Sequence, residues 1–220
     1  MKVSVIITAG GIGKRMGAKE PKQFLLLCGR PILQRTIEQF HKYDQDIQVI
    51  LTLPEEWITY WQELCEKHNF QIAHKLVIGG KERYHSIKNA LNDVQGEVVL
   101  VHDGVRPLVN KELIDRVVTS VKHSGGVVPA IPMSNSIRKG TKEDNLAKNR
   151  SLYWEVQTPQ GFMGQTLIDA YKKSFTHEIT DDASLVEKSG GSIEIVNGET
   201  NNIKITSPMD MLIAERILDC

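Results

Sequence analysis

The sequence predicts an α/β protein with a largely parallel, twisted sheet and helices on both of its faces. Two observations lead to this prediction. Short apolar runs alternate along the chain with amphipathic stretches, which is the pattern of repeated β-α units. Several runs, such as residues 3–7, are almost continuously apolar, as expected for strands that are buried on both sides. Right-handed crossovers then place helices on both faces of the sheet.

The individual elements follow in chain order from this alternation. The predicted strands cover residues 3–7, 47–53, 74–78, 97–101 and 127–131. The predicted helices between and after them cover residues 32–41, 56–68, 86–91 and 112–122. Two later helices are indicated by their capping residues. Thr180 is a candidate N-cap for a helix over 181–188, and Ser207 precedes a helix that begins at Pro208.

A polar stretch at residues 134–153 interrupts the alternation. One interpretation is a surface insertion without regular structure. The other is an extended arm that leaves the sheet and reaches a partner subunit. We favour a single domain over residues 1–220, with residues 134–153 as a protruding dimerisation arm.

Composition excludes several classes of protein. The 220 residues are 40% hydrophobic and 25% charged, and 27 basic residues balance 27 acidic ones. This lack of basic excess argues against a nucleic-acid partner. The apolar run at the N-terminus is too short for a signal peptide or a membrane span. Three widely spaced cysteines suggest neither a disulfide framework nor a zinc site, so we expect a protein of the reducing cytoplasm.

The first predicted strand leads directly into a glycine-rich segment, TAGGIGKRMG, at residues 8–17. Glycines after a strand let backbone N–H groups approach phosphates. The segment is not a Walker A loop, because Arg15 stands where Ser or Thr is required, and it is not a dinucleotide fingerprint, because Met16 replaces the third glycine. Arg15 and Lys22 are candidate cations for a polyphosphate. The alternative is that these basic residues are solvated loop charges.

Two further motifs follow predicted strands. In VHDGVRP, Asp103 stands at the carboxyl end of a strand, where open α/β sheets bind ligands, and it suits Mg²⁺. The alternative for Asp103 is a helix N-cap. Arg106 is a candidate ligand for an acceptor phosphate or hydroxyl. In GGKERYHS, Gly80 permits close approach of the backbone and Ser86 offers a hydroxyl to a base or ribose, although such a turn is a weak signal alone.

Three late segments, QTPQGF, TDDAS and NNIKIT, supply hydroxyl, amide and ammonium groups that would individually be typical of caps and turns. With AGGIGKRM, PKQF, GGKERYHS and VHDGVRP, they form an ordered set over residues 8–206 that resembles the 2-C-methyl-D-erythritol 4-phosphate cytidylyltransferases of the non-mevalonate isoprenoid pathway. The resemblance implies a Rossmann-like nucleotidyltransferase fold, a Mg²⁺ requirement and a homodimer with interlocking arms. It also implies transfer of CMP from CTP to 2-C-methyl-D-erythritol 4-phosphate with release of pyrophosphate.

The resemblance also implies a role for each matched residue. A charge-stabilising pair and two further groups would form the catalytic set: Arg15, Lys22, Arg150 and Thr158. The nucleotide would contact a phosphate loop, a base and ribose site, and a metal ligand: Ala9, Gly10, Gly11, Gly13, Gly80, Ser86 and Asp103. The acceptor pocket would comprise Arg106, Ser136, Thr158, Thr180 and Lys204. Arg150, at the end of the arm, would enter the neighbouring subunit's site.

Some positions depart from the family pattern. Asn201 stands where an acid is frequent, Ser136 where threonine is common, Lys81 where an acid is common, and Gly104-Val105 where two alanines are frequent. Three rival functions remain open at this point. A ribitol 5-phosphate cytidylyltransferase shares several of the motifs, a dinucleotide-binding oxidoreductase shares part of the loop, and a non-catalytic nucleotide-binding subunit would share the fold.

Overall fold

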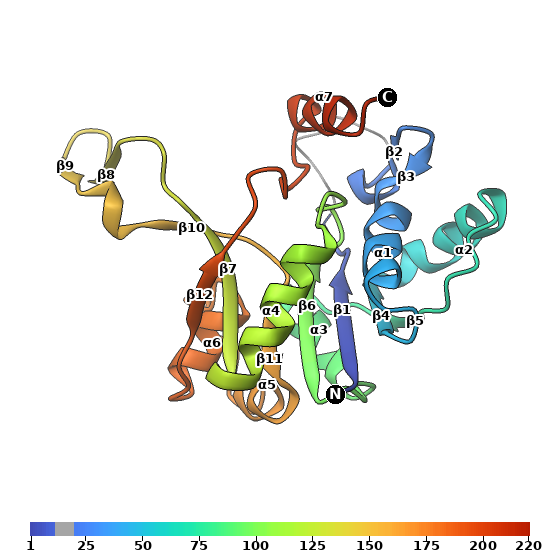
Figure 1. Cartoon of the computed structure of the whole chain (residues 1–220), viewed down its shortest axis with the longest axis horizontal. Coiled ribbons are helices and arrows are strands. Elements are labelled where there is room, and N and C mark those ends of the chain that lie inside the picture. Colours follow the sequence, from blue (N-terminus) through green and yellow to red (C-terminus); the bar gives the residue numbers. More distant parts are fainter. Residues whose placement is uncertain (12–19) are drawn as a thin grey trace.

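The structure is a computed structural model that describes residues 1–11 and 20–220 (Figure 1). Its centre is a mixed, mostly parallel sheet, and the described strands run in the order β10-β7-β11-β6-β1-β4-β5, with β12 paired to β7. All five predicted strands are present, with ends shifted by a residue or two. They are β1 (Val3–Thr8), β4 (Gln48–Leu53), β5 (Lys75–Ile78), β6 (Val98–Asp103) and β7 (Gly126–Pro132).

Three strands of this sheet were not predicted: β10 (Trp154–Val156), β11 (Gln160–Met163) and β12 (Glu194–Asn197). Strand β11 lies antiparallel between β6 and β7, and β10 is antiparallel to β7. Each is only three or four residues long. A run that short shows no clear period, so only pairing with longer neighbours makes it a strand.

The four predicted helices of the first half are α1 (Ile32–Tyr43), α2 (Ile58–Lys67), α3 (Arg83–Leu91) and α4 (Lys111–Ser124). A 3-10 turn at Glu55–Trp57 precedes α2. Helices α5 (Gly164–Ala170), α6 (Asp182–Lys188) and α7 (Pro208–Ile217) follow. Ser207 caps α7 as predicted, but the cap of α6 is Asp181 rather than Thr180, because the Asp181 carboxylate accepts the N–H of Ser184.

Alternate residues of the central strands enter two different cores. Val5 and Ile7 of β1 pack in the cluster that contains the buried faces of α1, α2 and α4. Ile6 packs in the cluster that contains α3, α5 and α6. Because successive side chains of a strand point to opposite faces, this division confirms helices on both sides of the sheet. Full burial of one such side chain contributes about 1.5–3 kcal/mol.

The carboxyl ends of β1, β4, β5 and β6 meet at one edge of the sheet, and backbone hydrogen bonds join the loops that leave them. Gly104 N donates to Thr8 O at 2.9 Å, and Ala9 N donates to Thr52 O at 3.1 Å. From β1 the chain goes to β4 and β5 on one side and later to β6 on the other. This reversal of strand order makes the edge a topological switch point, where open α/β sheets bind ligands.

Residues 134–153 contain an antiparallel hairpin of β8 (Ile137–Gly140) and β9 (Asn145–Lys148), followed by a 3-10 turn at Arg150–Leu152. The hairpin projects away from the sheet beyond β7 and β10 (Figure 1). Large apolar side chains at its base and tip are exposed, including Leu146, Leu152 and Trp154. The interpretation as an unstructured insertion is therefore wrong, and the segment is an ordered arm.

The expectation about cysteines is corrected. Cys28, in the turn between β2 (Leu26–Leu27) and β3 (Arg30–Pro31), forms a disulfide with Cys220, with the two Cα atoms 5.8 Å apart. The two cysteines are separated by 192 residues, so their spacing carried no signal. They meet because α7 returns to pack on the β2–β3 turn. In the described part of the chain, no helix combines the length and apolar character that a membrane span requires.

The N-cap of helix α4 can be tested by substitution. Asn110 is its N-cap, and the Asn110 side chain accepts the N–H of Leu113 at 2.8 Å. We expect Asn110→Ala to lower the free energy of unfolding by about 1 kcal/mol, because the N–H of Leu113 loses its acceptor. Urea denaturation measures the change. Asn110→Asp, which keeps a cap oxygen, should stay near the parent, and equal losses in both variants would contradict the capping role.

Candidate active site

A cavity of about 340 Å³ opens at the switch point. It is lined by residues of the β1, β5 and β6 loops, the first turns of α3 and the segment before α7. Eight residues predicted from the sequence lie in its wall: Ala9, Gly10, Gly11, Lys22, Gly80, Ser86, Asp103 and Lys204. The predictions for Gly13 and Arg15 fall outside the described residues.

Among the described residues, packing requires a glycine at one position of the cavity wall but not at two others. A Cβ atom on Gly10 or Gly11 would meet no described atom within 4 Å, so packing among the described residues does not demand a glycine there. A Cβ on Gly80 would lie 2.3 Å from the Cβ of His85, so packing alone requires that glycine. The N–H of Gly80 also donates to Ser86 Oγ at 3.0 Å. The Ser86 hydroxyl therefore closes this turn as well as lining the cavity.

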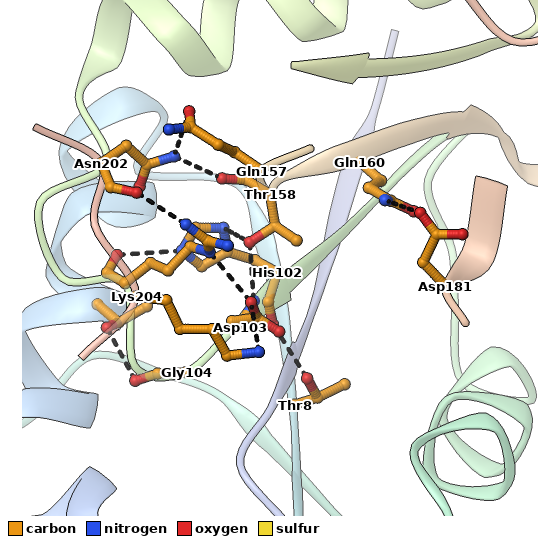
Figure 2. A network of polar contacts seen from close by, with 12 residues as sticks. Thr8, His102, Asp103, Gly104, Gln157, Thr158, Gln160, Asp181, Asn202 and Lys204 are labelled. Carbon is orange, nitrogen blue, oxygen red and sulfur yellow. Dashed lines mark hydrogen bonds and ion pairs between the residues drawn. The ribbon is translucent and has the colours of Figure 1, made fainter. Parts of the chain in front are cut away.

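Asp103 is the central charge of the site (Figure 2). Its Oδ2 atom accepts Arg106 Nε at 3.0 Å and lies 3.2 Å from Lys204 Nζ. Burial would raise the pKa of this carboxyl, but Lys204, Arg106 and Arg83 together hold it below its ordinary value. Asp103 is therefore an ionised carboxylate. The N-cap alternative is wrong, because Asp103 ends β6 and Asn110 caps the next helix.

Thr158 supports Asp103 from behind. Its hydroxyl oxygen accepts the backbone N–H of Asp103 at 3.1 Å and lies 3.0 Å from His102 Nδ1. Burial lowers the pKa of His102 to about 4, so the ring is neutral. With the proton on Nε2, His102 donates to Arg106 O at 3.1 Å and accepts the Thr158 hydroxyl at Nδ1. Thr158 is buried, and among the described residues it does not line the cavity.

Two buried amides, which the sequence did not single out, hold the loops of the site together. Asn202 Nδ2 donates to Thr158 O at 2.8 Å (Figure 2). Asn202 O accepts Arg106 Nη1 at 2.8 Å. Gln23 Nε2 donates to Ala9 O at 2.7 Å. Both residues stand inside predicted motifs, NNIKIT and PKQF, but an amide in a loop gives no sign of burial until its partners are known. Asn201, the neighbouring departure, is exposed.

Thr180 lies beside the cavity rather than in it. It is exposed and lines a second hollow of about 260 Å³, which shares Glu82 and Arg83 with the first. Gln160 holds this segment, because its Nε2 donates to Asp181 Oδ2 at 2.7 Å and its Oε1 accepts Ala183 N at 3.1 Å. The predicted acceptor residue Thr180 is thus near the cavity but separated from it by the side chains that the two hollows share.

Ser136 and Arg150 are not brought to the Asp103 cavity of their own chain. Both lie on the arm and are exposed, and Arg150 Nη1 donates to Ser134 O. Arg150 instead lines a separate hollow between the arm and the loop after β12. Arg106 reaches the site only through Asp103 and Asn202, and among the described residues it does not line the cavity.

The described wall of the cavity carries two carboxylates that could serve a metal ion, Asp103 and Glu82. Among the described residues, no group of three or more His, Cys, Asp and Glu side chains forms a metal cage. Mg²⁺ is commonly held by one or two carboxylates together with substrate phosphates, so a full cage is not needed. Asp103 is ionised and Glu82 lines the same cavity. The residues therefore fit a Mg²⁺ that arrives with a nucleotide.

Comparison with known proteins gives the family. The model of the 2-C-methyl-D-erythritol 4-phosphate cytidylyltransferase family matches residues 3–220. The chain belongs to this family. A cytidylyltransferase of Azobacteroides pseudotrichonymphae is 48% identical over 98% of both chains, and one of Bacteroides fragilis is 44% identical over 98% of this chain and 99% of its own.

Solved structures of the cytidylyltransferase family have the same fold. The crystal structure of the enzyme from Thermus thermophilus is 31% identical and covers 100% of both chains with a TM-score of 0.82. A 4-diphosphocytidyl-2C-methyl-D-erythritol synthase from Anaerococcus prevotii is 26% identical, covers 100% of this chain and 99% of its own, and has a TM-score of 0.83. The sequence resemblance, the Rossmann-like nucleotidyltransferase fold and the class of enzyme are confirmed. Membership in the family argues against the ribitol phosphate, oxidoreductase and non-catalytic alternatives.

The role of Thr158 behind Asp103 can be tested. We expect Thr158→Val to lower the free energy of unfolding by about 1–3 kcal/mol, because the buried N–H of Asp103 and His102 Nδ1 both lose their partner. Thermal and urea denaturation measure this, and the turnover rate should fall with it. Thr158→Ser keeps the hydroxyl and serves as the control. A valine variant as stable and active as the serine variant would exclude the role.

Proposed function

We propose that the Asp103 cavity binds CTP with Mg²⁺ and that its cations stabilise the attack of 2-C-methyl-D-erythritol 4-phosphate on the α-phosphorus. The family to which the chain belongs transfers CMP from CTP to this acceptor in isoprenoid precursor biosynthesis. The observation that supports this use of the site is the ionised carboxylate of Asp103, which is paired with Lys204 and lines the same cavity as Lys22 at the sheet's switch point.

In the proposed step, an oxygen of the acceptor phosphate forms a bond to the α-phosphorus while the bond to the pyrophosphate oxygen breaks. The attacking phosphate is already ionised, so no general base has to remove a proton. This fits the neutral, fully buried His102. The chain's contribution is positioning and charge: Lys22 and, outside the described residues, Arg15 would offset the negative charge of the phosphates.

Asp103, with Glu82 of the same cavity wall, would hold the Mg²⁺. The ion would neutralise phosphate charge when bound with the nucleotide. Among the described residues, no atom would meet a Cβ on Gly10 or Gly11 within 4 Å, so their backbone N–H groups would have room to face the phosphates. Gly80 and Ser86 line the same cavity and would contact the cytidine.

The acceptor would lie on the side of Lys204, Arg106 and Thr180. Ser136 and Arg150, the remaining predicted acceptor residues, are on the arm and away from this cavity. We therefore propose a homodimer in which each arm brings these two residues to the partner's site. The exposed apolar side chains of the arm, Leu146 and Leu152, are suited to burial in such an interface.

We also infer a cytoplasmic location, because both substrates of the family are phosphorylated metabolites. The cytoplasm keeps thiols reduced, so this location does not predict the Cys28–Cys220 disulfide.

The charge-stabilising pair is tested by substitution. We expect Lys22→Ala and Arg15→Ala each to lower kcat by orders of magnitude, because phosphate charge in the transition state loses a counter-charge. Pyrophosphate release with CTP, Mg²⁺ and the acceptor measures the rate. Lys172→Ala, at an exposed ion pair with Asp169 on the surface, is the control. Turnover within a few-fold of the control in both variants would reject the assignment.

The action of the arm across the dimer is tested by mixing two inactive variants. Arg150→Ala should weaken acceptor use more than CTP binding. When Arg150→Ala and Lys22→Ala chains are dissociated together and reassociated, half of the sites in each mixed dimer would combine an intact Lys22 with the partner's intact arm. Roughly a quarter of the parent activity should then return, as expected for a symmetric dimer. If Arg150 acted within its own chain, mixing would restore no activity.

A further inference from the structure

Arg83 is a charged residue of the cavity that lies inside the motif GGKERYHS but for which the sequence analysis predicted no role. It is the first residue of α3, between Gly80 and Ser86, and its side chain lines both the Asp103 cavity and the hollow that contains Thr180. The side chain is 33% exposed, whereas its ion-pair partner, Asp182 of α6, is 0% exposed. The guanidinium is therefore anchored to a buried carboxylate, while the side chain stays partly exposed and lines the cavity.

The anchor uses both oxygens of the buried carboxylate. Arg83 Nη2 donates to Asp182 Oδ2 at 2.6 Å, and the Tyr171 hydroxyl donates to Asp182 Oδ1 at 2.5 Å. Tyr171 is itself fixed, because its ring stacks on Tyr84 with centroids 4.8 Å apart. The Tyr84 hydroxyl donates to Lys173 O at 2.5 Å and lies 3.2 Å from Tyr171 O. Asp182 is thus held from both sides by groups that leave it little freedom.

A buried ion pair of this kind is poor evidence for stability, because desolvation offsets much of the attraction. The Arg83–Asp182 pair is instead suited to holding a cation in a fixed position. Burial alone would lower the pKa of Arg83, but Asp182 raises it above its ordinary value, so the guanidinium is always charged. Within the described part of the chain, Nε and Nη1 donate no hydrogen bond. These donors are available for an anion in the cavity.

The charges around Arg83 favour an anionic ligand. Among the described residues that line the cavity, the cations Lys22, Lys81, Arg83 and Lys204 outnumber the acids Glu82 and Asp103. Lys22 begins a 3-10 turn, Lys22–Phe24, and Lys204 lies in the segment before α7, whereas Arg83 lies on the same loop and helix turn as Gly80 and Ser86. The ligand that meets this turn would be the nucleotide rather than the acceptor.

We propose that Arg83 is a second arginine that binds a phosphate of the nucleotide, and that Asp182 and Tyr171 are positioning residues that aim its guanidinium into the cavity. This rests on the proposed binding of CTP in that cavity. The ion pair also joins the first turn of α3, on the nucleotide side, to the first turn of α6, which follows Thr180. Arg83 thereby forms the wall between the two hollows.

The first experiment measures CTP binding to the full-length enzyme by calorimetry with Mg²⁺, and the kinetic constants of both substrates. We expect Arg83→Gln to weaken CTP binding at least tenfold and to leave the KM of the acceptor within about threefold, because one charge-assisted hydrogen bond to phosphate is lost. Arg116→Gln, which removes a surface ion pair with Glu199, is the matched control. Unchanged CTP affinity, or a loss confined to the acceptor, would overturn the assignment.

The second experiment separates positioning from structural support. If Asp182 acts through Arg83, Asp182→Asn should weaken CTP binding in the parent but add no further loss in the Arg83→Gln background. Additive losses in the double variant would overturn the positioning role. Tyr171→Phe keeps the ring and should weaken CTP binding less than Asp182→Asn does, again with no further loss in the Arg83→Gln background. It tests the positioning role if Asp182→Asn does not fold.

A third readout does not depend on packing. Added guanidinium ion should restore part of the CTP affinity that Arg83→Ala loses and should not raise the CTP affinity of Arg116→Ala. Only Arg83→Ala leaves a guanidinium-sized gap facing the nucleotide. Absence of rescue, with Arg83→Lys as impaired as Arg83→Ala, would count against a charge role. If CTP did not bind in this cavity at all, Lys22→Ala would also leave CTP binding and turnover intact. That result separates failure of the proposed function from failure of the Arg83 assignment.

Discussion

The carboxylate of Asp103 is the constraint on which the rest of the site depends. A nearly buried charge is costly unless cations and hydrogen bonds surround it. Lys204 and Arg106 supply the charge, and Thr158 holds the backbone N–H of the same residue. Each comes from a different part of the chain. The requirement to stabilise one ionised oxygen therefore brings loops from the middle and the end of the sequence to the carboxyl edge of β6.

That arrangement explains why the second half of the chain looks irregular in sequence but is well ordered in the fold. Strand β11 inserts between β6 and β7, and this places Thr158 directly behind Asp103. Asn202 then ties the Thr158 loop to Arg106. These short segments have little intrinsic preference of their own. They are fixed by pairing with longer strands and by the buried polar groups that they satisfy.

The arm carries predicted site residues that its own chain does not bring to the cavity. Arg150 and Ser136 belong to the residue set that the family resemblance implies, yet both lie away from the Asp103 cavity. Apolar side chains of the arm are exposed as well. The proposed partner subunit would account for both observations with one interface. The cavity residues of one chain would bind the nucleotide, and completion of the acceptor pocket would depend on association.

Sequence alone determined the five long strands, the helices between them and the motifs around Lys22, Asp103 and Lys204, because period, capping residues and glycine-rich turns are local signals. It did not reveal β11, the Cys28–Cys220 bond, the buried amides or the Arg83–Asp182 pair. These depend on residues far apart in the chain, and a polar side chain carries no mark of its eventual partner. The tertiary structure decided them, since only folding determines which charges are buried together and which face the ligand.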